Sequence, residues 1–300
     1  MTKIETIIGG IYPKSDDLRL AIGRWERGVI DSRKIESDIV FHTEKFDSLA
    51  EGVVHTEPLY NWYDIFRPLI SLIDGANLGP LTRFEETNTF YRIPEFEQEV
   101  SFDTDPFIYQ EIKDSPPLPI FKGSQESILF FPGPLTVAQY SRFNSGISRM
   151  NFIEKITEIM SAIAKASGKS ELFLMERVPL RDGYSRLIEE YFNPGQVYLF
   201  TSGRMKSSYF EGQKGKFRSI ITDPNRENIE ISRKFSVTPG VKIIESHNTR
   251  IEEEEHVKSV VSGYDVDRIF VTPDDYLDFL PRKVADRKLE LLQKVGEIDE

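Results

Sequence analysis

The chain has 300 residues, of which 39% are hydrophobic and 29% are charged, so it is long enough to bury a large core beneath a charged surface. Its 38 basic and 49 acidic side chains give a formal net charge of −11, which disfavours nucleic acids and anionic membrane surfaces as partners. The 19 Gly and 17 Pro residues are an ordinary share, which excludes collagen-like and low-complexity chains.

Cysteine is absent from the sequence. Its absence excludes disulfides, thiolate nucleophiles, iron–sulfur clusters and every zinc site built on cysteine. No apolar run approaches the roughly 20 residues of a membrane span. The N-terminal MTKIETIIGG is typical of a strand rather than of a signal peptide. We therefore expect a soluble, cytoplasmic protein.

Short apolar runs recur along the whole chain and predict strands. They lie at residues 4–8, 53–54, 128–131, 172–175, 197–201, 217–222, 241–244 and 269–272. Apolar residues at helical spacing lie between several of these runs. These predicted helices cover residues 18–25, 151–165, 249–261 and 284–295.

Strands that alternate with helices over about 300 residues predict an α/β fold, a (β/α)8 TIM barrel that takes up residues 1–300 as one domain. A doubly wound open sheet is the alternative. Residues 87–100, TNTFYRIPEFEQEV, are aromatic and β-prone with a Pro inside. This segment predicts a β-hairpin inserted after the second strand.

Barrels bind their ligands at the C-terminal ends of the strands, so the residues that follow each predicted strand are the candidates for a site. They combine carboxylates with arginines and suit a zwitterionic or multiply charged small ligand. Each of them alone is as well explained as a loop cap or a surface charge. The set comprises Gly9, Gly10, Glu57, Glu176, Arg177, Arg204, Asp223, His247, Asn248, Arg250, Asp274 and Asp275.

Six segments in collinear order resemble the cobalamin-independent methionine synthase family, and its N-terminal, zinc-free barrel most closely. The likeness covers nearly the whole chain, as a single-barrel protein, and implies a place in methionine biosynthesis. The segments are DLRLAIGRWERGVIDSRKI at 17–35, GVVHTE at 52–57, LTRFEETNTFYRIPEF at 81–96, FPGPLTVAQYS at 131–141, GVKIIESHNTRIEEEEHV at 240–257 and RIFVTPDDYLDFLPRKVADRKLELL at 268–292.

The resemblance implies a methyltransferase type of activity, but this chain departs from the family at the zinc ligands. The family's His-x-Cys pair matches residues 200–202, Phe-Thr-Ser, and its last Cys matches Asp275. The Asp of the family's Asp-Glu-Pro matches Met175, whereas Glu176 is retained and Arg177 replaces the Pro. The likeness therefore implies no metal and no resident cofactor in this chain, no self-sufficient activity, and a separate zinc-bearing barrel as partner.

The resemblance also suggests binding residues, although no catalytic residue is assigned. Glu57 matches a Glu that contacts the amino group of homocysteine in the family, or is a helix-start carboxylate. The candidates for substrate binding are Gly9, Gly10, Glu57, Glu176, Arg177 and Asn248.

The methyl donor implied by the resemblance is a methylated pterin or folate. Lys14 and Arg19 are candidates for its acidic tail, and Tyr60 and Tyr63 are either a stacking wall or core aromatics. Two other functions stay open. One is a non-catalytic scaffold that keeps only the barrel surface. The other is a decarboxylation of the uroporphyrinogen decarboxylase type, which ranks last because no long basic ring is visible.

Overall fold

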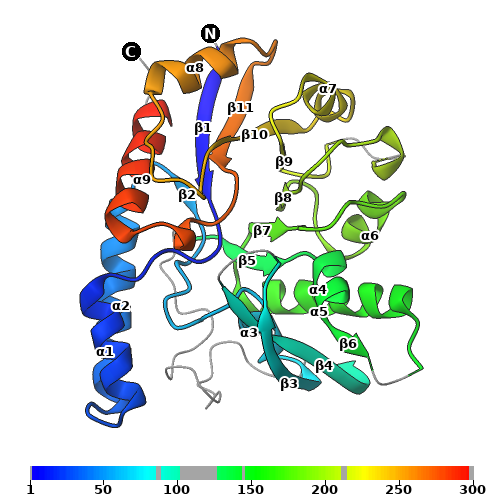
Figure 1. Ribbon diagram of the computed structural model, residues 1–300. Coiled ribbons are helices and arrows are strands. Elements are labelled where there is room, and N and C mark those ends of the chain that lie inside the picture. The colour runs from blue at the N-terminus through cyan, green and yellow to red at the C-terminus, as the bar shows by residue number, and fades with distance from the viewer. Residues whose placement is uncertain (1, 86–88, 102–126, 144–145, 211–214, 297–300) are drawn as a thin grey trace.

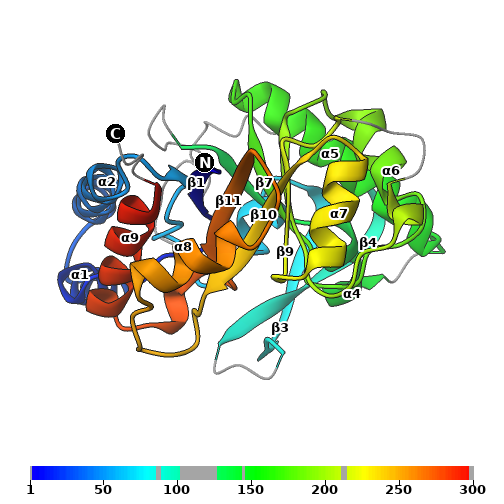
Figure 2. The same ribbon diagram turned by 90° about the horizontal axis from the view of Figure 1, so that it is seen from above.

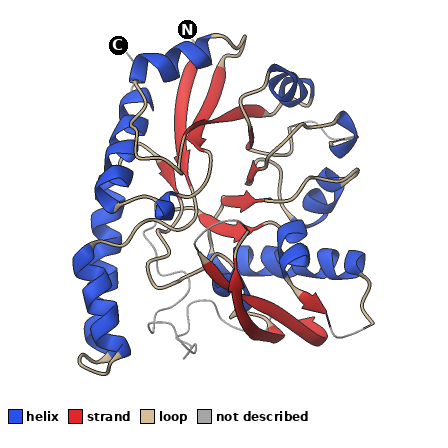
Figure 3. Cartoon of the chain, in the orientation of Figure 1, coloured by secondary structure: helices blue, strands red, loops and turns tan. Residues whose placement is uncertain are grey.

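The computed structural model describes residues 2–85, 89–101, 127–143, 146–210 and 215–296, with only the backbone for 97–99 (Figures 1 and 3). The strands within these ranges are β1 (Lys3–Ile8), β2 (Val54–His55), β3 (Asp74–Arg83), β4 (Phe90–Ser101), β5 (Leu129–Pro132), β6 (Arg142–Phe143), β7 (Leu172–Met175), β8 (Val197–Phe200), β9 (Ser219–Thr222), β10 (Thr238–Ile244) and β11 (Arg268–Pro273).

Helices follow most of these strands. They are α1 (Asp16–Glu26), α2 (Ser32–Leu49), α3 (Arg67–Ile70), α4 (Pro134–Tyr140), α5 (Arg149–Ser167), α6 (Tyr184–Tyr191), α7 (Arg226–Lys234), α8 (Glu254–Ser262) and α9 (Arg282–Gly296), with 3-10 turns η1 (Ser207–Tyr209) and η2 (Leu277–Phe279). No helix in the described ranges is both long enough and apolar enough to cross a membrane.

The main sheet of the described residues is parallel and has eight strands in the order β2-β1-β11-β10-β9-β8-β7-β5. Its two ends are linked where Thr56 bridges Ile128, and the Ile128 amide donates to His55 O at 2.9 Å. The order around the sheet is the chain order. A doubly wound sheet reverses its direction of winding, so this order favours the barrel arrangement.

Strands β5, β7, β8 and β9 are buried along their whole length. Continuous burial is expected where a parallel sheet is covered on both faces. Figure 2 shows α1, α2, α8 and α9 outside one half of the curled sheet and α4, α5, α6 and α7 outside the other half. All eight predicted strands are present, displaced by no more than three residues at either end.

The antiparallel pair β3–β4 lies between β2 and β5 in the chain and forms a second sheet with the short β6. Residues 87–100 were expected to form both arms of a hairpin. The described part of this segment is instead a single long strand, β4, whose partner is the upstream β3; residues 87 and 88 lie outside the described residues. Pro94 does not break β4, because it lies opposite Leu78, where the register of the ladder shifts.

Helices α1, α2, α5 and α7 begin at a side chain that accepts from a free backbone amide. Ser148 accepts from the Asn151 amide at the start of α5, and Gly168 ends that helix with φ of 67°. The helix predicted over 249–261 begins instead at Glu254. The residues before it form a loop in which Glu252 accepts from the Glu245 amide and from the buried Lys288.

Candidate functional site

Glu176, which follows β7, is fully buried. Its carboxylate accepts from the amides of Leu135 (3.0 Å) and Thr136 (2.8 Å), from the Thr136 hydroxyl (2.6 Å) and from the Tyr184 hydroxyl (3.0 Å). Burial raises the pKa of Glu176 to about 7, against the effect of these donors. The carboxylate thus fixes the turn between β5 and α4.

The same turn explains why residue 133 is a glycine. A Cβ at Gly133 would come within 2.1 Å of the Glu176 carboxyl carbon, so only glycine leaves room for that side chain. Thr136 in turn accepts from the Arg177 amide at 2.8 Å. Glu176 therefore acts through Thr136 on the position of Arg177, and its own oxygens are already used within the protein.

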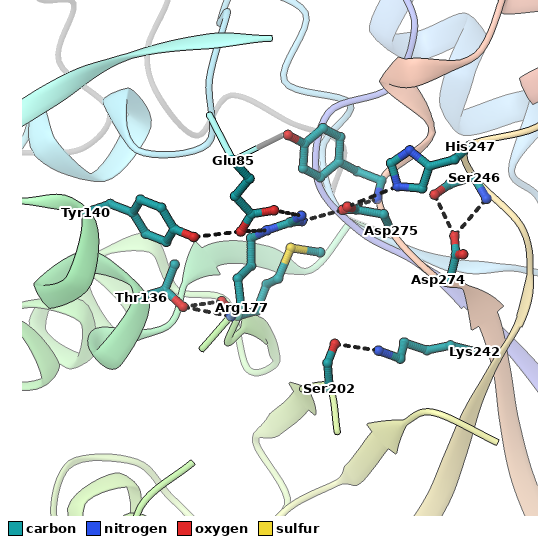
Figure 4. Close-up of polar contacts among 12 residues, drawn as sticks. Glu85, Thr136, Tyr140, Arg177, Ser202, Lys242, Ser246, His247, Asp274 and Asp275 are labelled. Carbon is teal, nitrogen blue, oxygen red and sulfur yellow. Dashed lines mark hydrogen bonds and ion pairs between the residues drawn. The ribbon is translucent and has the colours of Figure 1, made fainter. Parts of the chain in front are cut away.

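Arg177 lies in the mouth, by which we mean the C-terminal ends of β5, β7, β8, β9, β10 and β11 (Figure 4). Its guanidinium forms ion pairs with Glu85 at 2.8 Å and with Asp275 at 2.6 Å. It also lies over the rings of Phe84, at 5.0 Å, and Tyr276, at 5.8 Å. Arg177 thereby joins the end of β3 to the loop after β11.

The charged groups of this cluster shift one another's pKa values. Burial raises the pKa of Glu85, but hydrogen bonds from Arg177 and Tyr140 lower it more, so the pKa lies below its ordinary value. Asp275 behaves alike, because His247 and Arg177 outweigh the effect of its burial. The hydrogen bond to Asp275 raises the pKa of His247. The cluster is thus stable with its carboxylates ionised.

A second cation of the mouth is Lys242, on β10, which contacts residues that follow β8 and β9. The Lys242 side chain is only 3% exposed and its ammonium pairs with Asp223 at 2.6 Å. It donates to the Ser202 hydroxyl at 2.7 Å and lies 4.8 Å from the centre of the Phe200 ring. Sequence analysis missed Lys242, although a lysine inside the apolar run GVKII was a visible signal.

These residues do not fit the zinc that the catalytic barrel of the resembling family binds. Phe200 has no donor atom, Ser202 is engaged by an ammonium, and Asp275 is engaged by a guanidinium. Within the described ranges, no three His, Cys, Asp or Glu side chains are grouped so that they could hold a metal ion. A dication placed here would meet two protein cations, which is unfavourable.

Gly9 and Gly10 serve close packing at the end of β1. A Cβ at Gly9 would lie 2.8 Å from the Phe173 ring, and one at Gly10 would lie 2.8 Å from Tyr276 Cβ. Gly10 also has φ of 87°, a conformation that favours glycine. Its amide donates to Thr56 Oγ1 at 3.1 Å, so the backbone of this turn is engaged internally.

Two other candidates lie apart from the Arg177 cluster. Glu57 is half-buried, and its charge acts on Lys169, whose ammonium donates to Ser127 O at 2.7 Å. Asn248 is exposed. Its side chain accepts from the Arg250 amide at 2.8 Å and donates to Glu245, as part of the loop before α8.

The candidates for donor binding are only partly brought together. The Lys14 ammonium lies 5.4 Å from the centre of the Tyr63 ring and donates to Trp62 O at 2.9 Å. Arg19 is exposed on α1, and its charge helps to lower the pKa of Lys14, although burial lowers it most. Tyr60 is buried against Phe46 and accepts from Arg282 at 2.9 Å.

A narrow crevice opens beside Tyr63, between the β3–β4 pair and the main sheet. It is nearly closed, since the volume that water can enter is only about 10 Å³, room for about one water molecule. Its walls are aromatic, with Asp64 and Asp278 as the polar groups. The lining residues are Ile11, Tyr63, Asp64, Ile65, Phe66, Phe84, Thr89, Phe90, Tyr91, Tyr276 and Asp278.

Comparison with known proteins agrees with the resemblance seen in the sequence. The methionine synthase of Sulfurisphaera tokodaii is 38% identical over 69 residues, which are 22% of this chain and 20% of that protein. The match thus spans about a fifth of the curated relative. No family profile matches the chain.

Solved structures match over nearly the whole chain. A B12-independent methionine synthase from Shewanella sp. W3-18-1, in complex with selenomethionine, has a TM-score of 0.67 at 12% identity and covers 97% of this chain and 96% of that one. A putative vitamin-B12 independent methionine synthase from Listeria monocytogenes has a TM-score of 0.63 at 14% identity, with coverage of 96% and 95%. These structures show that the chain has the fold of B12-independent methionine synthases.

Proposed function

We propose that this chain is a zinc-free barrel of the methionine synthase type that acts with a separate zinc-bearing barrel and binds the methyl donor or the amino acid. The observation that carries the proposal is the pair of cations, Arg177 and Lys242, which engage Asp275 and Ser202, two of the positions that the resemblance matches to zinc ligands. A barrel built in this way has no means of holding the homocysteine thiol as a thiolate on a metal.

The residues of the mouth suit binding rather than bond-making. Arg177 is held by Asp275 and by two aromatic rings, so its guanidinium is oriented before any ligand arrives. The Shewanella structure contains selenomethionine, an amino acid with a carboxylate and an ammonium. A mouth that carries both signs of charge is complementary to such a zwitterion.

The methyl donor in this proposal is a methylated pterin or folate, placed beside Tyr63. The crevice is too narrow to take the ring between its walls, but the exposed face of Tyr63 at its rim suits stacking of a flat heteroaromatic ring, with Lys14 beside Tyr63 for an acidic tail. Tyr60 is 1% exposed, so it supports this region from inside the core.

The proposal is tested by methyl transfer to homocysteine, measured with the purified chain, with the zinc-bearing barrel protein of the same organism, and with both. We expect no turnover by this chain alone after metal removal, and a higher rate with both proteins than with the zinc barrel alone. Turnover by the isolated, metal-free chain would contradict the proposal. The control variant is Arg204→Met, which breaks an exposed ion pair with Glu227. This variant should support the same rates as the wild-type chain.

One observation favours a non-catalytic scaffold as the second candidate. Both cations of the mouth already have carboxylate partners within the chain, as expected of a protein that binds no ligand there. Calorimetry with a methylated folate and with homocysteine separates the two functions. A saturable heat signal at micromolar concentration excludes the scaffold. Its absence with both compounds, from the wild-type chain and also from a variant that lacks the Glu85 carboxylate, excludes the binding barrel.

A further inference from the structure

The Glu85 carboxylate is held in the way that proteins hold a ligand carboxylate. Arg177 Nε donates to one of its oxygens at 3.2 Å, and Nη2 donates to the other at 2.8 Å. Tyr140 adds a hydroxyl donor at 2.6 Å. Figure 4 shows these groups converging on Glu85. A two-pronged guanidinium contact of this kind is specific for planar carboxylates.

The Arg177 guanidinium does not depend on Glu85 for its position. Asp275 accepts from Arg177 Nη1 at 2.6 Å, and Phe84 and Tyr276 flank the guanidinium. The Arg177 amide is fixed by Thr136 at 2.8 Å. With Glu85 withdrawn, Nε and Nη2 would therefore still point to the same place, as an empty carboxylate site.

Glu85 itself is placed at some cost. Its backbone has φ of 51°, a left-handed conformation that is uncommon for a residue with a Cβ. It comes from the β3–β4 pair, 92 positions before Arg177 in the chain. Its side chain is 30% exposed, whereas that of Arg177 is 13% exposed, so Glu85 is the member of the pair that solvent reaches more easily.

We propose that Arg177 and Tyr140 form a binding site for the carboxylate of a small ligand, and that Glu85 fills this site as an internal competitor. The amino acid and the glutamyl tail of a folate share this chemistry. The inference deepens the proposed function by naming the group that is recognised, and it rests on that function only for the choice of probes.

Removal of the competitor tests the inference. In Glu85→Gly the carboxylate is lost, while glycine adopts the observed φ without strain. Calorimetry uses two probes, L-methionine and the triglutamate form of 5-methyltetrahydrofolate, with L-methioninamide as the matched compound that lacks a carboxylate. At least one carboxylate probe should bind about tenfold more tightly to Glu85→Gly than to the wild-type protein. The reason is that Glu85 no longer competes for Arg177, so every molecule has an open binding site.

The expected pattern assigns the source of the carboxylate. Tighter binding of L-methionine but not of the amide identifies the amino acid, and tighter binding of the triglutamate identifies the donor tail. The gain should vanish in the Glu85→Gly/Arg177→Met double variant. Glu95→Gln, which alters another ion pair of β4, with Arg142, should leave both affinities at the wild-type value.

Two results would overturn the site. One is that Glu85→Gly binds neither probe more tightly than wild type, and the other is that the double variant keeps the gain. If thermal unfolding shows that Glu85→Gly is not folded, Glu85→Asn replaces it, because asparagine tolerates a left-handed backbone. No partner protein enters these measurements, so failed methyl transfer in the mixed assay leaves their result unchanged.

Discussion

The two cations of the mouth differ in the burial of their partners. Arg177 pairs with Asp275, whose side chain is 6% exposed, and with Glu85, whose side chain is 30% exposed. Lys242 is more deeply buried than Arg177, but its partner Asp223 is 47% exposed. A carboxylate left unpaired inside the protein is costly, whereas one at the surface returns to water. The contribution of each cation to the free energy of unfolding should therefore depend on the burial of its partner carboxylate and not on the burial of the cation.

The largest expected effect comes from Arg177→Met. This change leaves Asp275 buried without its guanidinium, so the free energy of unfolding should fall by about 3 kcal/mol, as measured by urea denaturation. The control Arg204→Met breaks an ion pair with Glu227 in which both side chains are exposed and should cost less than about 0.5 kcal/mol. Equal losses in the two variants would contradict the comparison.

Glu176 sharpens the comparison, because it is a buried carboxylate with hydrogen-bond donors but no cation in direct contact. Its pKa of about 7 lies above the ordinary 4.5, so the folded protein binds the proton more tightly than the unfolded chain does. The stabilisation is complete below pH 4.5 and is lost as the pH rises through 7, by about 1–3 kcal/mol.

The measurement is the free energy of unfolding of wild type and of Glu176→Gln between pH 4.5 and 8. The difference between the two proteins should change over this range. A constant difference would show that the pKa of Glu176 is not raised.

Lys242→Met provides the direct contrast with Arg177→Met. Methionine keeps the apolar contact with Phe200, and Asp223 is exposed enough to be hydrated. We therefore expect a loss below about 1 kcal/mol in the same urea experiment. A loss as large as that of Arg177→Met would mean that the burial of the cation, and not of its partner, sets the cost.

The smallest effect is expected at His247, whose imidazole lies 3.6 Å from Asp275 at the solvent edge of the Arg177 cluster. The hydrogen bond to Asp275 raises the pKa of His247, so its stabilising effect is complete below pH 6.5 and is lost as the pH rises through the raised value. His247→Gln should lower the melting temperature by about 1 °C at pH 5.5 and leave it unchanged at pH 8.5.

An NMR titration checks the same contact through the pKa of His247 itself. The His247 pKa should lie above 6.5 in wild type and fall in Asp275→Asn. It should rise in Arg177→Met, because the charge of Arg177 lowers it. A pKa that does not respond to either change would place His247 outside the cluster.

Much of the fold could be predicted from local pattern. The apolar run at residues 172–175 is β7, and Ser148 and Gly168 bound α5 where the helical spacing begins and ends. The start of α8 could not be predicted, because the acidic run before it is helix-compatible. Contacts with Lys288, on α9, hold Glu252 in a loop instead.

The candidate site was predicted in part. Arg177 was identified from its place after a strand, but its partner Glu85 was not, because no local pattern links residues 92 positions apart. Glu176 was expected at the mouth and is instead consumed by the β5–α4 turn. In the sequence Lys242 is flanked by apolar residues, as a core residue would be. Where its side chain points depends on how strands β8, β9 and β10 pack.

The sequence by itself determined the eight strands of the main sheet and the absence of cysteine, because hydrophobic periodicity and residue chemistry are local properties. Only the tertiary structure decided which charges meet. Closure of the sheet brings the ends of distant strands together, and each buried cation then stabilises the carboxylates that this closure places beside it.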